Sequence, residues 1–116
     1  MTMQPDCIFC KIVAGQIPAN KLYEDDELLA FADIHPAAPV HVLVVPKAHR
    51  VNLDDSQEAA DQALLGRLLQ TAPKIAREQG ATDGYRVVIN NGPGGGQEVF
   101  HLHMHILAGP RPWKRL

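Results

Sequence analysis

The chain has 116 residues, of which 46% are apolar and 21% charged, and its net charge is −2. This composition is typical of a globular protein with one hydrophobic core, so we expect a single domain over residues 1–116. The small net charge argues against a nucleic acid polymer as partner, and no apolar run approaches the ~20 residues of a membrane-spanning helix.

The N-terminal stretch MTMQPDC lacks the basic start and apolar centre of a signal peptide. The chain has only two cysteines. So few cysteines in a chain without an export signal are typical of a protein in a reducing compartment. We therefore expect a cytoplasmic protein without a disulfide framework.

The first predicted element is a short helix over Cys7–Ala14, because its apolar residues recur at helical spacing and Gly15 offers a stop. Two short apolar segments follow, Lys21–Glu24 and Leu28–Ala32. An acidic turn separates them, which predicts an antiparallel hairpin.

Two prolines in Asp33–Pro39 exclude regular structure, and the valine-rich His41–Pro46 predicts a buried strand. A long amphipathic helix should begin at Asp54 or Ser56 and end near Gly80. Pro73 lies inside it and should bend or break it, because proline removes a backbone donor.

The last elements are a strand over Tyr85–Asn90, a glycine-rich loop over residues 91–96 and a strand over Phe100–Leu107. Strands joined by short turns, with one long helix to cover a face, predict an α+β fold built on an antiparallel sheet.

The run FHLHMHIL places His101, His103 and His105 on one face of the last strand. Neighbouring histidines are then ~6.7 Å apart along the strand, and the outer two ~13 Å apart. Zinc holds nitrogen ligands at ~2.0–2.1 Å, so the three imidazoles are poorly placed to share one ion. We expect them to have different roles.

Four glycines, at positions 92, 94, 95 and 96, precede this run. Glycines let a backbone approach a ligand closely and direct N–H groups at a phosphate. A neutral imidazole is a good nucleophile toward phosphorus. The combination therefore indicates phosphate chemistry, against the alternative of histidines on a solvated sheet face.

The segment His101–Leu107 resembles the His-φ-His-φ-His-φ-φ signature of the histidine triad family, where φ is apolar. Further segments that resemble the family are Ile8–Ile12, Ile17–Ala19, Asp33–His41, Val45–His49 and Gly95–Gln97. The match covers nearly the whole chain and is nearest to the nucleotide-binding branch, in the variant with an N-terminal Cys-x-x-Cys.

The resemblance implies a five-stranded antiparallel sheet with one long and one short helix, in a homodimer with a continuous sheet. It also implies a purine nucleotide-binding hydrolase that cleaves nucleoside 5′-phosphoramidates and related acyl-nucleotides through a nucleotidyl-histidine. A nucleic acid polymer or a membrane is not an expected partner. An apolar slot accepts adenine or guanine equally.

In this resemblance His103 is the nucleophile, His105 contacts the phosphate, and His41 lies behind the triad whose first member is His101. The implied nucleotide-binding residues are Asp33, Ile34, Asn90, Gly96, Gln97, Val99, His103, His105, Phe9, Ile12, Phe31 and Leu43. Asp33 would accept the ribose hydroxyls. For the apolar members, a role as ordinary core residues is equally compatible with the sequence.

Cys7 and Cys10 have metal-ligand spacing, but one C-x-x-C is only half of a zinc site. The resemblance implies that His49 and His101 complete a structural zinc site that the chemistry does not require. Two buried free thiols are the alternative. A thioredoxin-like redox motif is disfavoured, because no strand is predicted before it.

Three other functions stay open: a dinucleoside polyphosphate hydrolase, a regulatory nucleotide-binding protein with incidental hydrolysis, and a metal-dependent hydrolase, which the strand geometry disfavours. Glu98 departs from relatives that have Ser or Thr there, because a carboxylate repels phosphate unless it meets a cationic leaving group. Trp113 either reaches a partner subunit's site or anchors the tail. We expect Lys47 and Arg50 to be charged side chains exposed to solvent.

Overall fold

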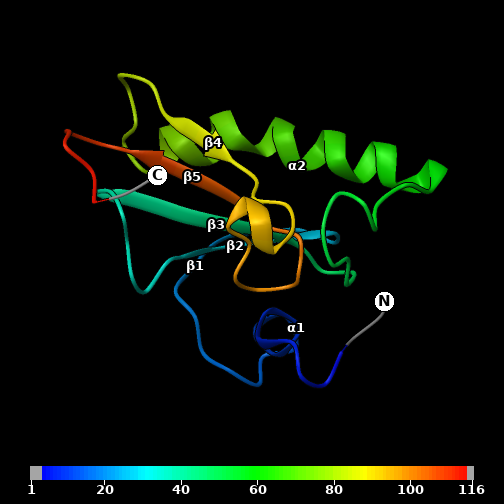
Figure 1. Cartoon of the computed structure of the whole chain (residues 1–116). Coiled ribbons are helices and arrows are strands. Elements are labelled where there is room, and N and C mark those ends of the chain that lie inside the picture. The colour runs from blue at the N-terminus through cyan, green and yellow to red at the C-terminus, as the bar shows by residue number, and fades with distance from the viewer. Residues whose placement is uncertain (1–3, 115–116) are drawn as a thin grey trace.

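The computed structural model describes residues 4–114. Its strands β1 (Lys21–Glu24), β2 (Leu28–Ala32), β3 (Val40–Pro46), β4 (Arg86–Val88) and β5 (Met104–Ala108) form one antiparallel sheet in the order β1-β2-β3-β5-β4. The long helix α2 (Ala59–Glu78) lies along one face of the sheet, and the short helix α1 (Ile8–Val13) lies on the other side (Figure 1). The predicted five-stranded α+β fold is confirmed.

Alternate residues of the central strands enter two separate cores. The core under α2 contains Leu28, Ala30, Val42, Val44, Leu102, Met104 and Ile106. The core on the α1 side contains Phe9, Ile12, Leu29, Phe31, Leu43 and Val45. Because both faces are covered, β2 and β3 are nearly continuous apolar runs.

Helix α2 begins at Ala59, later than the expected start at Asp54 or Ser56. The carboxylate of Asp61 accepts a hydrogen bond from the Glu58 backbone N–H at 3.1 Å and so caps the first turn. Ser56 is bonded elsewhere, because its hydroxyl donates to the Asn52 carbonyl at 2.8 Å.

The C-terminal end of α2 matches the expectation at Gly80, whose φ of 84° is the left-handed conformation that favours glycine. Of the bend or break expected at Pro73, the break is wrong, because the helix runs through this residue. The carbonyl that loses its backbone donor belongs to Leu69, whose side chain is half exposed. Position 69 lies on the exposed side of the helix, where water is available to replace the missing hydrogen bond.

The last two strands are shorter than expected. β4 covers only Arg86–Val88, and β5 begins at Met104, so His101 and His103 precede the strand. The backbone N–H of Leu102 pairs with the carbonyl of Arg50 at 2.6 Å and not with a neighbouring strand. The alternation still holds, because Leu102 and Met104 enter the core under α2.

Within the described residues, neither helix combines the length and the apolarity that a membrane crossing requires.

The turn between β1 and β2 is tied to α2 through Asp25. Burial raises the pKa of the Asp25 carboxyl, but hydrogen bonds from Tyr23 and from two backbone N–H groups, with the charge of Arg67, outweigh it and bring the pKa to about 2. Both Tyr23 and Arg67 donate to Oδ2.

We expect Asp25→Asn to remove part of the acid sensitivity of the fold. A lowered folded-state pKa stabilises the fold above pH ~4, and that contribution is lost as pH falls toward ~2. After allowance for solvent screening we expect about 1 kcal/mol at pH 7. Urea unfolding at pH 7 and pH 3 measures it. Asp26→Asn, at the exposed neighbouring position, is the matched control. Equal pH dependence in both variants would contradict the assignment.

Candidate active site and metal centre

A pocket of about 630 Å³ opens on the sheet face opposite α2. Its volume lies in the range of small-molecule sites. Apolar side chains from α1, β2 and β3 form one part of its wall, and polar side chains from the loops and β5 form the other.

The residues expected to bind nucleotide all line this pocket, although they are scattered along the sequence. They are Phe9, Ile12, Phe31, Asp33, Ile34, Leu43, Asn90, Gly96, Gln97, Val99, His103 and His105. Phe9, Ile12, Phe31 and Leu43 are also buried core residues, so both interpretations of them apply. His41 lines the pocket as well, whereas the ring of His101 lies elsewhere.

His103 is held in one tautomer by the backbone. Its Nδ1 lies 2.7 Å from the carbonyl oxygen of His101, and a carbonyl can only accept, so Nδ1 carries the proton. Burial lowers the pKa of His103, which keeps the ring neutral. The lone pair of the neutral ring is therefore on Nε2.

His41 and His105 form a directed pair. The backbone N–H of Ala37 donates to Nδ1 of His41 at 2.9 Å, so neutral His41 carries its proton on Nε2. That atom lies 2.8 Å from Nδ1 of His105 and 3.4 Å from a carboxylate oxygen of Asp33. Hydrogen bonding therefore explains why the side chains of Asp33, His41 and His105 lie close together. Because Nδ1 of neutral His105 accepts from His41, the proton of His105 is on its Nε2.

The glycine-rich loop is braced from within. Gly92 and Gly96 have φ of 76° and 89°, which only glycine adopts readily. The amide of buried Gln97 accepts from the Gly92 N–H at 2.8 Å and donates to the carbonyls of Val51 and Val99 at 2.6 and 3.1 Å. Gln97 therefore holds the loop shape with its side chain.

A second group of side chains converges beside this pocket: Cys7, Cys10, His49 and His101. Nδ1 of His101 lies 3.2 Å from Cys7 Sγ and 3.6 Å from Cys10 Sγ. Nδ1 of His49 lies 3.3 Å from Cys10 Sγ and 3.2 Å from Nδ1 of His101.

These four atoms fit a tetrahedral zinc ion. Bonds of ~2.3 Å to sulfur and ~2.0–2.1 Å to nitrogen put the ligand atoms about 3.3–3.8 Å apart. His101 Nε2 lies 2.8 Å from the Pro46 carbonyl, which places its proton there and leaves Nδ1 as a ligand atom. Burial lowers the pKa of His101 to about 4 and also lowers that of His49, so both rings present lone pairs at pH 7.

Local structure explains why these residues meet. The Cys7 side chain caps α1 by accepting from the Cys10 N–H at 3.3 Å, so both sulfurs lie at the same end of the helix. His49 follows β3 and His101 precedes β5, and these strands are neighbours in the sheet. The cluster therefore joins α1 to the ends of two central strands.

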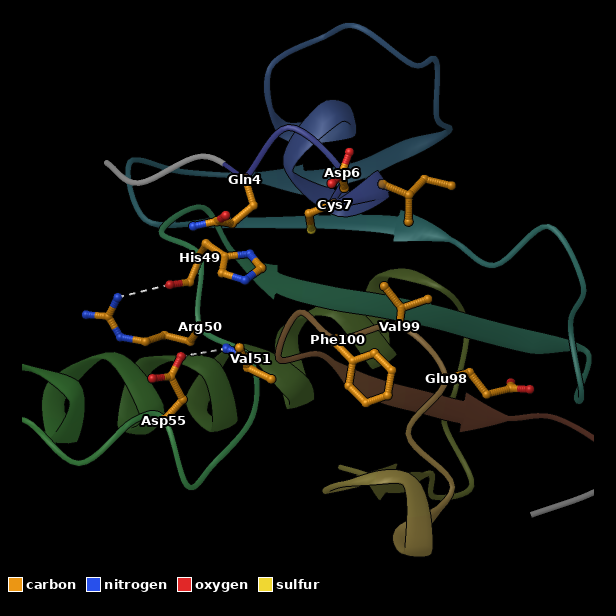
Figure 2. Close-up of a pocket in the computed structure, with 11 residues that line it drawn as sticks. Gln4, Asp6, Cys7, His49, Arg50, Val51, Asp55, Glu98, Val99 and Phe100 are labelled. Atoms are coloured by element: carbon orange, nitrogen blue, oxygen red, sulfur yellow. Dashed lines mark hydrogen bonds between the residues drawn. The ribbon is translucent and has the colours of Figure 1, made fainter.

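A wider cavity of about 830 Å³ lies outside the cluster and shares Ile8, Glu98 and Val99 with the first pocket. Figure 2 shows the Cys7 thiol and the His49 ring directed toward one another at one end of this cavity, with Glu98 at the other. The cavity connects the cluster to solvent.

Some contributors could not be recognised from the sequence. The carbonyls of Pro46 and His101 and the N–H of Ala37 are backbone groups without a side-chain signature. Arg50, expected to be a solvated charge, lies 3.1 Å from the carboxylate of Asp61, which is 1% exposed.

Trp113 anchors the tail on its own chain. Its Nε1 donates to the Gly109 carbonyl at 3.1 Å, and its ring packs with the small core of Ala37, Ala38 and Leu107. This contact agrees with the expectation of a tail anchor.

The fold and the alternating histidines define a histidine triad protein, and the comparisons with known proteins agree. The HIT domain family matches residues 14–111, and the chain belongs to this family. Protein HitA of Neisseria gonorrhoeae is 52% identical over 107 residues, which cover 90% of this chain and 97% of HitA. The 14 kDa zinc-binding protein of Brassica juncea is 46% identical over 106 residues, which cover 90% of this chain and 93% of that protein.

Solved structures show the same likeness. A histidine triad protein from Clostridium difficile has a TM-score of 0.89 and 48% identity, with 96% of each chain covered. A HIT family hydrolase from Legionella pneumophila Philadelphia 1 has a TM-score of 0.86 and 46% identity, with 91% of this chain and 95% of that chain covered.

Proposed function

We propose that this protein hydrolyses purine nucleoside 5′-phosphoramidates, and related acyl-nucleotides, through a covalent nucleotidyl-histidine at His103. The observation that carries the proposal is the 2.7 Å contact of His103 Nδ1 with a backbone carbonyl, which leaves a neutral, nucleophilic Nε2 in a nucleotide-sized pocket. The name of the similar Legionella protein, a HIT family hydrolase, supports the reaction class.

In the first step Nε2 of His103 attacks phosphorus, the phosphorus–nitrogen bond breaks, and its electron pair leaves with the amine, which takes up a proton. The Nε2–H of His105 is the donor that the His41 contact orients toward the phosphate. The Asn90 side chain and the backbone N–H of Val99 line the same pocket and stabilise charge on the phosphoryl oxygens.

In the second step water attacks phosphorus and gives its proton to His105, which replaces the proton lost to the amine. The bond to His103 breaks with its electron pair on the ring, which releases the nucleoside monophosphate and restores the neutral ring. Asp33 binds the ribose hydroxyls, since each carboxylate oxygen can accept one. The apolar wall, which includes Phe31 and Leu43, receives the purine ring.

We further propose that Cys7, Cys10, His49 and His101 hold a structural zinc, which crosslinks α1 to the sheet and does not contact the reacting atoms. The protein is proposed to be a cytoplasmic single domain over residues 1–116. Its proposed homodimer extends the sheet through β4, an edge strand with exposed Tyr85 and Val87. Light scattering coupled to size exclusion tests the dimer.

Intact-protein mass spectrometry after brief mixing with a purine nucleoside phosphoramidate tests the mechanism. Quenching at mildly alkaline pH preserves phosphorus–nitrogen bonds. We expect a transient adduct of one nucleoside monophosphate that maps to His103. Hydrolysis without an adduct on this time scale would favour direct attack by water. Tight nucleotide binding without hydrolysis would support a regulatory binding protein.

Glu98 should select the charge of the leaving group, because this exposed acidic residue lines both cavities. We expect Glu98→Gln to lower kcat/KM about threefold to tenfold for a phosphoramidate with an ammonium-bearing leaving group, as for an exposed charge pair. Steady-state kinetics with a neutral leaving group of the same size supplies the control. A similar change for both substrates would contradict this role.

A further inference from the structure

We propose that the cluster of Cys7, Cys10, His49 and His101 positions the His103 ring, so that metal occupancy controls the rate of turnover as well as stability. The effect on turnover rests on the proposed function of His103, whereas the effect on its ring geometry does not.

The first link is His101, which acts as a positioning residue. Its side chain is completely buried, and its ring contacts the Pro46 carbonyl through Nε2 and the cluster through Nδ1. The carbonyl of the same residue accepts the 2.7 Å hydrogen bond from His103 Nδ1. The contacts of the His101 ring therefore also hold the backbone whose carbonyl fixes the tautomer and direction of His103, and their loss would let this backbone shift.

The second link is Phe9, which lies between the two cysteines in α1. Its ring packs edge-on against His103 and His101, with centroid separations of 5.2 and 5.9 Å. Phe9 therefore packs against the side of the His103 imidazole, and the position of the Phe9 ring depends on the position of α1.

The position of α1 depends in turn on the cluster. The helix has six residues, and helices of this length are marginal without tertiary contacts. Among the described residues, the backbone–backbone hydrogen bonds of residues 4–16 join residues within that segment. Apolar packing of Phe9 and Ile12, together with the contacts of Cys7 and Cys10 with His49 and His101, therefore joins α1 to the sheet.

The cluster itself needs a cation to hold its shape. Two sulfurs and two imidazole nitrogens lie within 4.8 Å of one another, so their lone pairs face a common centre. Without a cation, each thiol can donate to one imidazole Nδ1, but these weak hydrogen bonds hold the four side chains less firmly than coordination to a metal does. The His101 and Phe9 supports should then relax together.

The expected signature is a fall in kcat that exceeds the change in nucleotide affinity, because Phe9 is one of several side chains in the pocket wall, whereas Phe9 and the His101 carbonyl both hold His103. Displacement of a reacting group by ~1 Å costs about 10²-fold in rate. Asp33, which we assign to the ribose hydroxyls, accepts from the His35 N–H at 2.8 Å and lies 3.4 Å from His41 Nε2, so residues outside the cluster hold it in place. We expect kcat to fall at least about tenfold, with the Kd for a nucleoside monophosphate within about threefold.

The experiment compares the zinc-loaded chain, the chain after chelation through the outer cavity, and Cys7→Ser. Kinetics with a purine nucleoside phosphoramidate gives kcat and KM, calorimetry gives Kd, and ¹⁵N spectra of the histidine rings report the His103 tautomer at fixed pH. Loss of the metal should bring the ¹⁵N chemical shifts of the two His103 ring nitrogens toward the values averaged between the two tautomers. Addition of zinc should restore the original chemical shifts. Leu68→Ala, in the separate core under α2, is the control for lost stability.

The proposal fails if folded, metal-free protein keeps the parent kcat and His103 signature, or if Leu68→Ala reproduces both changes. Should the metal-free chain unfold, His49→Gln provides the same comparison, because it removes one ligand and leaves His101 and α1 intact. A parent chain without turnover would contradict the proposed function, yet the ¹⁵N comparison would still decide the positioning role.

Discussion

We expect His103→Asn to lower kcat for a purine nucleoside phosphoramidate by at least about 10³-fold, the scale seen when a catalytic nucleophile is removed. Asparagine keeps an N–H group for the His101 carbonyl but has no imidazole lone pair to attack phosphorus. The apolar wall and Asp33 stay in place, so the Kd for the nucleoside monophosphate should remain within about threefold. Single-turnover kinetics and calorimetry measure the two effects separately.

His105→Asn is the informative comparison for this prediction. It removes a proposed phosphate contact and proton donor but keeps the nucleophile, so we expect a loss nearer 10²-fold. The covalent adduct should still form in His105→Asn and be absent in His103→Asn. Turnover of His103→Asn at the parent rate would disprove the mechanism, and an adduct on His105 would reassign the nucleophile.

The second large effect concerns the metal. We expect one zinc per chain after expression in zinc-supplemented medium, and Cys10→Ser, at a position only 2% exposed, should lose it. Free zinc at 100 times its Kd stabilises a folded chain by about 2.7 kcal/mol. For a domain of this size that corresponds to a fall of about 10 °C in Tm on chelation.

Elemental analysis and calorimetric melting with and without chelator check this expectation. Leu68→Ala serves as the reference, because it should lower Tm while it retains the metal. Protein that contains no zinc even after supplementation, and whose Tm does not respond to chelator, would establish the alternative of two buried free thiols.

Much of the fold follows from local patterns in the sequence. The alternation of apolar residues and histidines around His103 correctly separates the core under α2 from the pocket face. The hairpin of β1 and β2 and the end of α2 at Gly80 follow from turn residues and glycine. The start of α2 does not follow from the local sequence. Ser56 and the aspartates near it are all possible caps, and tertiary contacts select among them.

The candidate site is predictable only in part. The pair Cys7 and Cys10 identifies half of a metal site by spacing, but His49 and His101 were assigned to it by family resemblance. The sequence predicted a regular strand over Phe100–Leu107, and from such a strand the position of the His101 ring beside α1 could not be inferred. Glu98 was recognised as a departure, yet its place between two cavities was not apparent.

The sequence by itself determined which side chains are candidates for the chemistry and on which face of the last strand they alternate, because side-chain type and alternation are local properties. Tertiary structure alone decided how these residues act on one another. The tautomer of His103 depends on a carbonyl, that of His41 on the Ala37 N–H, and the metal cluster on the pairing of β3 with β5. Backbone groups are the same in every residue, so only the folded chain shows which of them face an imidazole.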